Sequence, residues 1–463
     1  SKVSSKILNQ LMDYLAQVIR TQKHSLSYWL PILNAFYEVH VELSDPLRAA
    51  YFELATSDDT IPEEADSSYL DSIKDLIQEL SDLSVYDIAE NFFAQSYAMP
   101  ADFFADLVVD LYNIQEGQDI GLLTLLHPNP QVRQIVLPIL DQIVEHVILS
   151  STSLSRLEVI KHWYPKNQQA LFDKWIKTQR KKGVVFAVEN TAPVNISIRA
   201  TEVDGSGSQG IFIHIRKGRK NRLCGLLLKE GLGIKDAWTT PEISTADVKE
   251  YYHQAFEESV TIRKVDSEYL QTMVEHFLAI GCQKNNIPGL HFLEIQEMLG
   301  LRLRPKQLDV DHLVEQLSIQ IAPFTQENSN LSLARSKSWL KNKKFTESWY
   351  IESALIDKIV NHNSSFIDGT KVCRLNQAMQ AVFDEEMEQH RGKWLFHFLW
   401  IALWAKANAK KHEKIWQDSL LIAYLIHEKH PLRNIPVMHE ICRQTVINSV
   451  ETMQERGTHL NQE

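Results

Sequence analysis

The sequence predicts a mainly α-helical protein, with a helical-repeat-like N-terminal array, a small antiparallel β meander in the middle and a helical C-terminal domain. Residues that favour helix are plentiful, whereas the 16 Gly and 15 Pro are few for a chain of 463 residues. Only the stretch from Val184 to Trp238 alternates apolar and polar residues with a period of two. The 44% of hydrophobic residues are enough for a sizeable core.

We expect four parts along the chain, because charge and periodicity change together. They are an acidic helical domain at 1–182, an antiparallel β module with a basic hairpin at 183–243, a basic helical segment with a loop at 244–345 and a C-terminal helical domain at 346–463.

The net charge of −11 is unevenly distributed. Residues 1–173 hold 10 Lys/Arg and 25 Asp/Glu, a net charge of −15, whereas residues 174–345 hold 25 and 19, a net charge of +6. Three interpretations stay open. The helix faces are solvated and simply happen to be acidic, the acidic surface keeps the protein soluble and repels nucleic acid, or the acidic and basic parts dock on each other.

The N-terminal part shows repeated helix starts. Asp45-Pro46 and Asn129-Pro130 each place a capping residue before a proline, and Pro100 opens a helix in the same way. Ser155 with Glu158 predicts a capping box for a helix toward Trp163. A further helix is expected over Gln168 to Lys182.

One helical hairpin has a family pattern. The run from Leu122 to Leu126 is followed by His127-Pro128-Asn129-Pro130, then by the pair Val132-Arg133 and further apolar residues. This pattern, around residues 118–147, resembles a HEAT repeat, in which a short turn with Pro and Asn precedes a Val-Arg pair that opens the second helix. The resemblance implies stacked helical hairpins and a protein-binding scaffold. No family is recognised for the whole chain.

The β module is predicted from alternation and from turn residues. The expected strands are Val184 to Val188, Asn195 to Glu202, Gly210 to Lys217 and Arg222 to Lys229. Asp204 to Ser208 and Lys217 to Arg219 are the expected hairpin connections. A meander of about 55 residues is too small to be stable alone, so we expect it to pack on flanking helices.

Helical patterns return after the β module. Ser244 and Asp247 predict a capped helix to Ser259, and Pro323 to Ser336 is expected to be a linker or loop. The other expected helices are Ser267 to Cys282, His291 to Leu299, Asp309 to Ile321, Trp349 to Asn361, Arg374 to Lys411, Ile415 to His427 and Val437 to Met453.

Two basic segments are the candidate binding residues. The hairpin contributes Arg216, Lys217, Arg219, Lys220 and Arg222, and the second segment contributes Lys337, Trp339, Lys341, Lys343 and Lys344. Arginine and lysine bind phosphates, and interleaved aromatic rings stack on unpaired bases. The alternative interpretation is a solvated turn with a lysine-rich edge that blocks pairing between sheets.

The glycine-rich run from Gly205 to Gly210 has GxGxxG spacing, but a strand and not a helix is expected to follow it. We therefore interpret it as a hairpin turn. Lys229, Lys235 and Asp236 are candidate lining residues of an unrecognised enzyme pocket. The simpler interpretation is a buried strand, a glycine turn, and Trp238 anchoring the sheet to helices.

No metal or cofactor is expected. His427 and His430 are three residues apart with Pro431 next, whereas the zinc-protease motif places its two histidines four apart on one helix face. The four cysteines are far apart and form no CxxC pair, which indicates free thiols in a cytosolic protein.

A membrane location is not expected either. The chain begins without an apolar run, so no signal peptide is expected. The most apolar segment, Trp394 to Ala405, is too short to span a bilayer and is interpreted as a buried core helix.

These observations favour a cytosolic helical scaffold or adaptor that acts by protein–protein recognition. The first alternative is a nucleic-acid-associated protein that contacts phosphate through the basic hairpin and residues 335–344. The second is an enzyme with an unrecognised site near Lys229 or among the C-terminal histidines. No catalytic residue is assigned.

Overall fold

The computed structural model describes residues 2–21, 28–29, 32–33, 35–36, 39, 41–58, 65–97, 99–188, 195–218, 220–255, 261–321, 325–339, 349–367, 370–409 and 414–460. Contacts divide the chain into two compact units. Unit 1 comprises residues 1–190 and 289–300, and unit 2 comprises 191–288 and 301–463. The four-part division stays a prediction.

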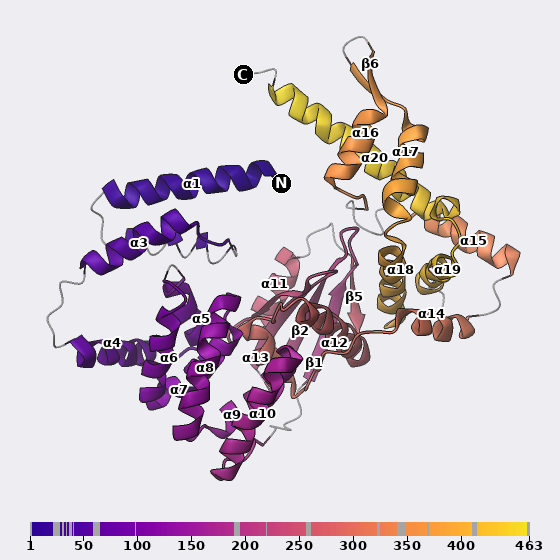
Figure 1. Ribbon diagram of the computed structural model, residues 1–463. Helices are drawn as coiled ribbons and strands as arrows, with labels where there is room; N and C mark the ends of the chain where they lie inside the picture. Colours follow the sequence, from indigo (N-terminus) through magenta and orange to yellow (C-terminus); the bar gives the residue numbers. More distant parts are fainter. Residues whose placement is uncertain are drawn as a thin grey trace. The chain divides into compact units, whose positions relative to one another are not determined.

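Unit 1 is helical (Figure 1). Its elements are α1 (Lys2–Thr21), α3 (Asp45–Asp58), α4 (Ala65–Glu79), α5 (Val85–Gln95), α6 (Phe103–Asn113), η1 (Gln115–Gly117), α7 (Gln118–Leu123), η2 (Thr124–Leu126), α8 (Pro130–His146), α9 (Ser151–Ile160), η3 (Lys161–Trp163), α10 (Lys166–Lys181) and α13 (Leu290–Leu299).

The helix start at Asn129 is confirmed. The Asn129 side chain accepts a hydrogen bond from the Gln131 backbone N–H at 2.8 Å, and Pro130 occupies the first helical position. Together, α7, η2 and α8 form the helical hairpin that the sequence predicts, while the resemblance to HEAT repeats stays a prediction.

The capping box at Ser155 and Glu158 is wrong. The cap of helix α9 is five residues earlier, where the Ser150 hydroxyl accepts from the Ser153 backbone N–H at 2.9 Å. Ser150 also donates to Asp119 at 2.7 Å, and this contact favours the earlier start.

Unit 2 combines a sheet with helices. Its strands are β1 (Asn195–Thr201), β2 (Ser208–Lys217), β3 (Lys220–Lys229), β4 (Gly233–Thr239), β5 (Ile262–Val265), β6 (Ser364–Ile367) and β7 (Thr370–Cys373). Its helices are α11 (Thr245–Ala255), α12 (Ser267–Gln283), α14 (Val310–Ile319), α15 (Gln326–Lys337), α16 (Ala354–His362), α17 (Leu375–Val382), η4 (Phe383–Met387), α18 (Arg391–Lys406), α19 (Ile415–His427), η5 (Leu432–Asn434) and α20 (Pro436–Leu460).

The main sheet has the order β4-β3-β2-β1-β5, with every neighbouring pair antiparallel. Directly opposed residues share a face. Ile213 lies opposite Ile198 on one side and Cys224 on the other, and all three are buried. Phe212 lies on the other face, where its ring contacts Trp238, which in turn contacts Tyr251 of α11. Trp238 therefore anchors the sheet to a helix, as the sequence predicts.

Two strand predictions need correction. Val184 to Val188 is not a strand, because the Ala187 backbone N–H donates to the Ser151 carbonyl at 3.2 Å, so this segment bonds to the start of α9. The sheet gains β5 instead, which pairs with β1 and was not predicted, because its four residues give too short an alternation.

The predicted loop at Pro323 to Ser336 is wrong for its described residues. Helix α15 begins after Thr325, whose hydroxyl accepts from the Asn328 backbone N–H at 3.3 Å. The predicted helix from Arg374 is divided, because a π-helical turn, η4, and the turn at residues 388–390 separate α17 from α18. The β6–β7 hairpin was also not predicted.

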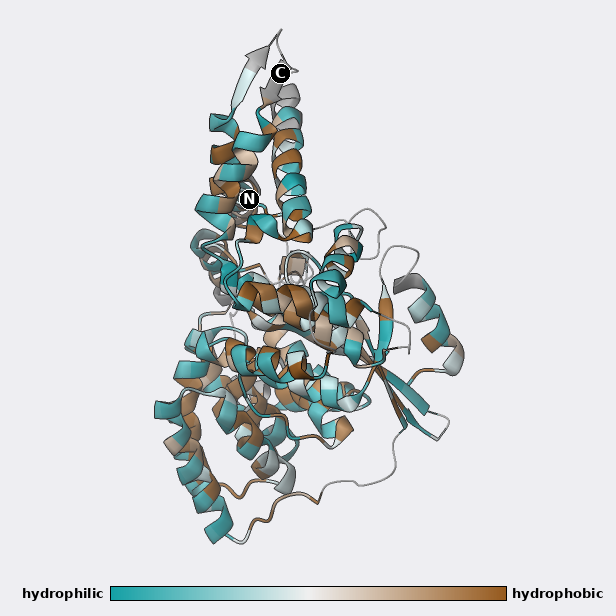
Figure 2. Cartoon of the chain, turned by 90° about the vertical axis from the view of Figure 1, so that its right-hand side faces the viewer, coloured by the Kyte–Doolittle hydropathy of each residue, from teal (hydrophilic) through white to brown (hydrophobic). Residues whose placement is uncertain are grey.

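The core of unit 2 lies between the sheet and helices α12 and α18. The Trp400 indole N–H lies 3.1 Å from the Tyr269 hydroxyl, which donates to the Gln209 side chain at 2.7 Å. The Trp404 indole donates to the Ala200 carbonyl at 3.1 Å. Brown and teal residues alternate along the helices of Figure 2, as expected where one helix face packs on a core.

Candidate functional site

The basic hairpin forms where the sequence predicts it. Lys217 of β2 lies opposite Lys220 of β3, so two residues make the turn. Gly218 has a φ of +65°, which favours glycine at this turn. Arg219 lies outside the described residues.

Several hairpin cations already have partners. Lys220 forms an ion pair with Glu242 at 2.6 Å. Half-buried Arg222 donates to the Thr240 carbonyl at 2.8 Å and so joins β3 to the segment after β4. Arg216 donates to the Gly218 carbonyl at 3.0 Å but stays exposed, as does Lys217. The tip therefore presents Arg216, Lys217 and a partly neutralised Lys220.

The second basic segment is placed only in part. Lys337 is the exposed last residue of α15, and Trp339 is 4% exposed, so its ring is not presented for stacking on a base. Lys341, Lys343 and Lys344 lie outside the described residues. Helix α15 packs on α19 and α20, whereas the hairpin strands contact α11 and α12, so the two segments have different neighbours.

The glycine-rich loop is a hairpin connection, because β2 begins at Ser208. The Lys229 ammonium donates to the hydroxyls of Ser206 at 2.7 Å and Ser208 at 2.8 Å. Burial lowers the pKa of Lys229 and raises that of Glu230 to about 7. Lys235 and Asp236 are exposed on β4, so the three predicted lining residues form no enclosed group.

The C-terminal histidines that the structure describes do not converge on a metal site. His397 is completely buried and packs edge-on against Trp349 at 4.9 Å, while His427 lies beside Asp311. His412 lies outside the described residues. Over the parts of the chain that are described, no three His, Cys, Asp or Glu side chains are placed to hold a metal ion. Likewise, no described helix is long and apolar enough to cross a membrane.

A cavity of about 240 Å³ lies in unit 1. It is formed where α5 ends and where α3, α6 and α8 begin. Its walls include Glu42, Arg48, Tyr97, Phe104, His127 and Gln131. The sequence pointed to the 127–133 turn only through the HEAT-like pattern, and it gave no signal for the other walls.

His127 holds the turn that forms one wall. Its Nδ1 accepts from the Asn129 backbone N–H at 3.1 Å, and its carbonyl accepts from Arg133 at 2.6 Å. The ring packs edge-on against Phe93 and Phe104, with centroids 4.7 and 4.5 Å away. Burial, assisted by the charge of Arg133, lowers the pKa of His127 to about 3, so the ring is neutral near pH 7.

The part of the lining before and at the start of α3 carries one charge of each sign. Arg48 donates to the Leu43 carbonyl at 3.4 Å and lies 4.0 Å from Asp45, so it is partly neutralised. Glu42 is exposed and has no ion-pair partner among the described residues. The Tyr97 hydroxyl donates to the Val41 carbonyl and ties this wall to the end of α5.

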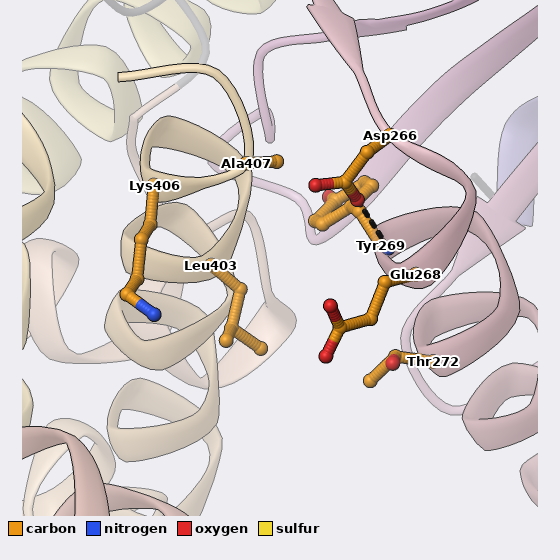
Figure 3. Close-up of a pocket in the computed structure, with 7 residues that line it drawn as sticks. All are labelled: Asp266, Glu268, Tyr269, Thr272, Leu403, Lys406 and Ala407. Carbon is orange, nitrogen blue, oxygen red and sulfur yellow. Dashed lines mark hydrogen bonds between the residues drawn. The ribbon is translucent and has the colours of Figure 1, made fainter. Parts of the chain in front are cut away.

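A smaller cavity, of about 150 Å³, lies in unit 2 between the start of α12 and the end of α18 (Figure 3). Asp266 and Glu268 line one side and Lys406 the other, above the buried Tyr269. No sequence pattern singled out these residues, because they are 140 positions apart and meet only through packing.

Comparisons with known proteins find partial similarity. Residues 100–183 match the family described as the Y4lR second domain, and residues 311–450 match the Y4lR C-terminal helical domain. Over 309 residues the chain is 28% identical to "Uncharacterized protein y4lR" of Sinorhizobium fredii (strain NBRC 101917 / NGR234). That match covers 64% of this chain and 56% of the relative, so the chain spans little more than half of the relative's length. No solved structure matches the chain.

The two matched stretches contain parts of both cavities. The first includes the turn from His127 to Val132, and the second includes the α18 side of the smaller cavity. These similarities name domains and no activity, and no family covers the whole chain.

Proposed function

We propose that this protein acts by recognition, as a helical scaffold or adaptor, and that it binds a basic segment of a partner protein at the unit 1 cavity. The observation that carries the proposal is the cavity itself, which joins apolar walls to Glu42, a carboxylate with no ion-pair partner in the described parts of the chain. Concave sites with a few polar groups among apolar side chains are the usual form of ligand sites.

The cavity suits a lysine or arginine side chain. The methylene groups of such a side chain would pack against Met99, Phe104 and Pro130, while its cationic end would meet the Glu42 carboxylate. Because Arg48 is turned toward Leu43 and Asp45, its repulsion of an incoming cation is reduced.

The surrounding charge favours the same partner. Residues 1–173 carry a net charge of −15, so their field attracts a basic segment and repels an acidic one. Surface charges at this density raise the rate of association, while the cavity contacts slow dissociation.

The test is fluorescence anisotropy of the full chain with labelled basic, neutral and acidic peptides of equal length. We expect only the basic peptide to bind, and we expect binding to weaken as salt is added. Gln131→Trp, which fills the rim of the cavity, should abolish binding. Gln142→Trp on the exposed face of the same helix should leave it unchanged.

A second pair of variants tests the carboxylate. Glu42→Gln should weaken basic-peptide binding about tenfold, the cost of one charge-assisted hydrogen bond. Glu79→Gln, which removes one equal charge from the exposed end of α4, should have little effect. Equal losses in the two variants would mean that general acidity, and not the cavity, attracts the peptide.

A second candidate function, nucleic-acid association, is supported by one observation at the hairpin. Lys217 lies directly opposite Lys220, and like charges in this arrangement destabilise a hairpin unless an anion lies between them. Glu242 already offsets part of this cost, so we place this candidate second.

The second candidate is tested by titrating labelled single- and double-stranded DNA and RNA across a salt series. It requires binding that falls log-linearly with salt and disappears when Arg216, Lys217 and Lys220 are changed to Ala. The absence of binding at low salt would rule out this candidate function.

We further propose that the protein acts in the cytoplasm, supported by the free thiol state of all four cysteines.

A further inference from the structure

The unit 2 cavity is lined by three charged side chains, the carboxylates of Asp266 and Glu268 and the ammonium group of Lys406, and no ion pair joins them among the described residues. Glu268 extends from the first turn of α12 toward α18, whereas Lys406 runs along the α18 side of the cavity from the last turn of that helix (Figure 3). The Lys406 ammonium lies 6.0 Å from the centre of the Trp416 ring. Neither has an ion-pair partner in the parts of the chain that are described. The cavity separates a carboxylate from an ammonium group.

The walls of this cavity are held by the buried core. Tyr269 of α12 and Trp400 of α18 both bond to Gln209 of β2, at 2.7 and 3.2 Å. Asp266 is committed to capping α12, since its carboxylate accepts from the Tyr269 backbone N–H at 2.8 Å. The core therefore fixes the backbone positions from which Glu268 and Lys406 project, while both side chains are exposed.

Helix-end electrostatics explain each charge alone but not their convergence. A carboxylate in the first turn and a lysine in the last turn each stabilise a helix. That effect requires only that each charge lie at its own helix end. It does not require the two ends to line one cavity, together with Thr272 and the apolar Leu403.

We propose that this cavity binds a small zwitterion, a free α-amino acid. Its ammonium group pairs with Glu268, its carboxylate pairs with Lys406, and its side chain packs on Leu403. A ligand of a single charge would satisfy one wall and leave the other unpaired, so both ends are required for binding. The volume of about 150 Å³ fits a small molecule and not a folded partner.

This site is independent of the recognition proposed for unit 1. It lies in unit 2, and its residues do not line the unit 1 cavity. Either proposal can fail without affecting the other.

The test is calorimetric titration of the full chain with the twenty common amino acids, followed by single-charge analogues of the best binder. The analogues are its amide, which lacks the carboxylate, and its N-acetyl form, which lacks the ammonium group. We expect each analogue to bind at least about tenfold more weakly than the parent amino acid, because each loses one charge-assisted contact.

Variants then locate the site. Glu268→Gln and Lys406→Met should each weaken binding about tenfold, while Glu385→Gln and Lys358→Met, exchanges elsewhere in unit 2, should not. Circular dichroism confirms that each variant is folded. The proposal is overturned if no amino acid binds at about 10 mM, or if the analogues and site variants bind as well as their parents.

Discussion

Arg156 of α9 and Glu297 of α13, 141 residues apart in sequence, form a bidentate ion pair within unit 1. The Arg156 Nε lies 2.8 Å from one Glu297 oxygen, and its Nη2 lies 3.2 Å from the other. The guanidinium also lies 4.9 Å from the centre of the Tyr86 ring. Beside this pair, Phe292 of α13 packs on Trp163 at 5.4 Å. A short segment from the middle of the chain is thus bound into the N-terminal unit.

Breaking this pair should destabilise unit 1. Glu297→Gln leaves the buried Arg156 guanidinium without its carboxylate, and because Glu297 is 38% exposed we expect a modest cost of about 1–3 kcal/mol. Urea denaturation measures the difference in free energy of unfolding from the wild type. The control is Glu116→Gln on the exposed surface, and an equal effect of both changes would contradict this role of the pair.

His291 gives the same segment a pH dependence. Its ring nitrogens lie 2.6 Å from Glu90 and 2.9 Å from Glu294, and despite burial these carboxylates raise the pKa of His291 to about 10. A raised pKa in the folded state stabilises the fold fully below the unfolded value of about 6.5. That stabilisation is then lost as the pH rises from about 6.5 to about 10.

The measurement for His291 is the difference in unfolding free energy between the wild type and His291→Gln at several pH values. We expect the difference to be largest near pH 6 and to shrink steadily toward pH 10. Comparing the two proteins removes the contribution of groups that they share. A difference that is flat with pH would show that His291 is not charged in the folded protein.

Gly225 of β3 is required by the Trp238 ring. A Cβ atom at this position would lie 2.2 Å from the indole, and the indole is packed between Phe212 and Tyr251. Gly225→Ala should therefore cost about 1–3 kcal/mol by overpacking. Gly392→Ala is the matched control, because a Cβ atom there meets nothing within 4 Å, and its helix should be unchanged or slightly more stable. Thermal unfolding that ranks the two variants in the reverse order would contradict this packing.

The sequence correctly predicted the elements that depend on contacts between residues close together in the chain. Asn129 before Pro130 and Ser244 with Asp247 are caps formed within three residues, and both are present. The β2–β3 hairpin likewise follows from alternation and from Gly218 at the turn.

Features that depend on distant contacts were missed. Helix α15 has no apolar stripe to predict it, and Ser332 and Arg335 of that helix both bond to the buried Asp418 of α19. Strand β5 forms only because it pairs with β1. Arg222 was predicted to be a binding residue, but its side chain donates to the Thr240 carbonyl, 18 residues away in the sequence. Both cavities join residues that no spacing in the sequence relates. The predicted binding residues were chosen because positive charges cluster in the sequence. Such a cluster does not show which of these cations already bond to other residues of the folded chain.

The most direct test of the recognition proposal is hydrogen–deuterium exchange of the full chain with and without the basic peptide. The account predicts slower exchange in three segments that form the unit 1 cavity, at residues 41–48, 99–104 and 127–133. It also predicts no change at the β2–β3 hairpin. Protection of the hairpin, or a bound peptide that protects none of the three segments, would contradict the account.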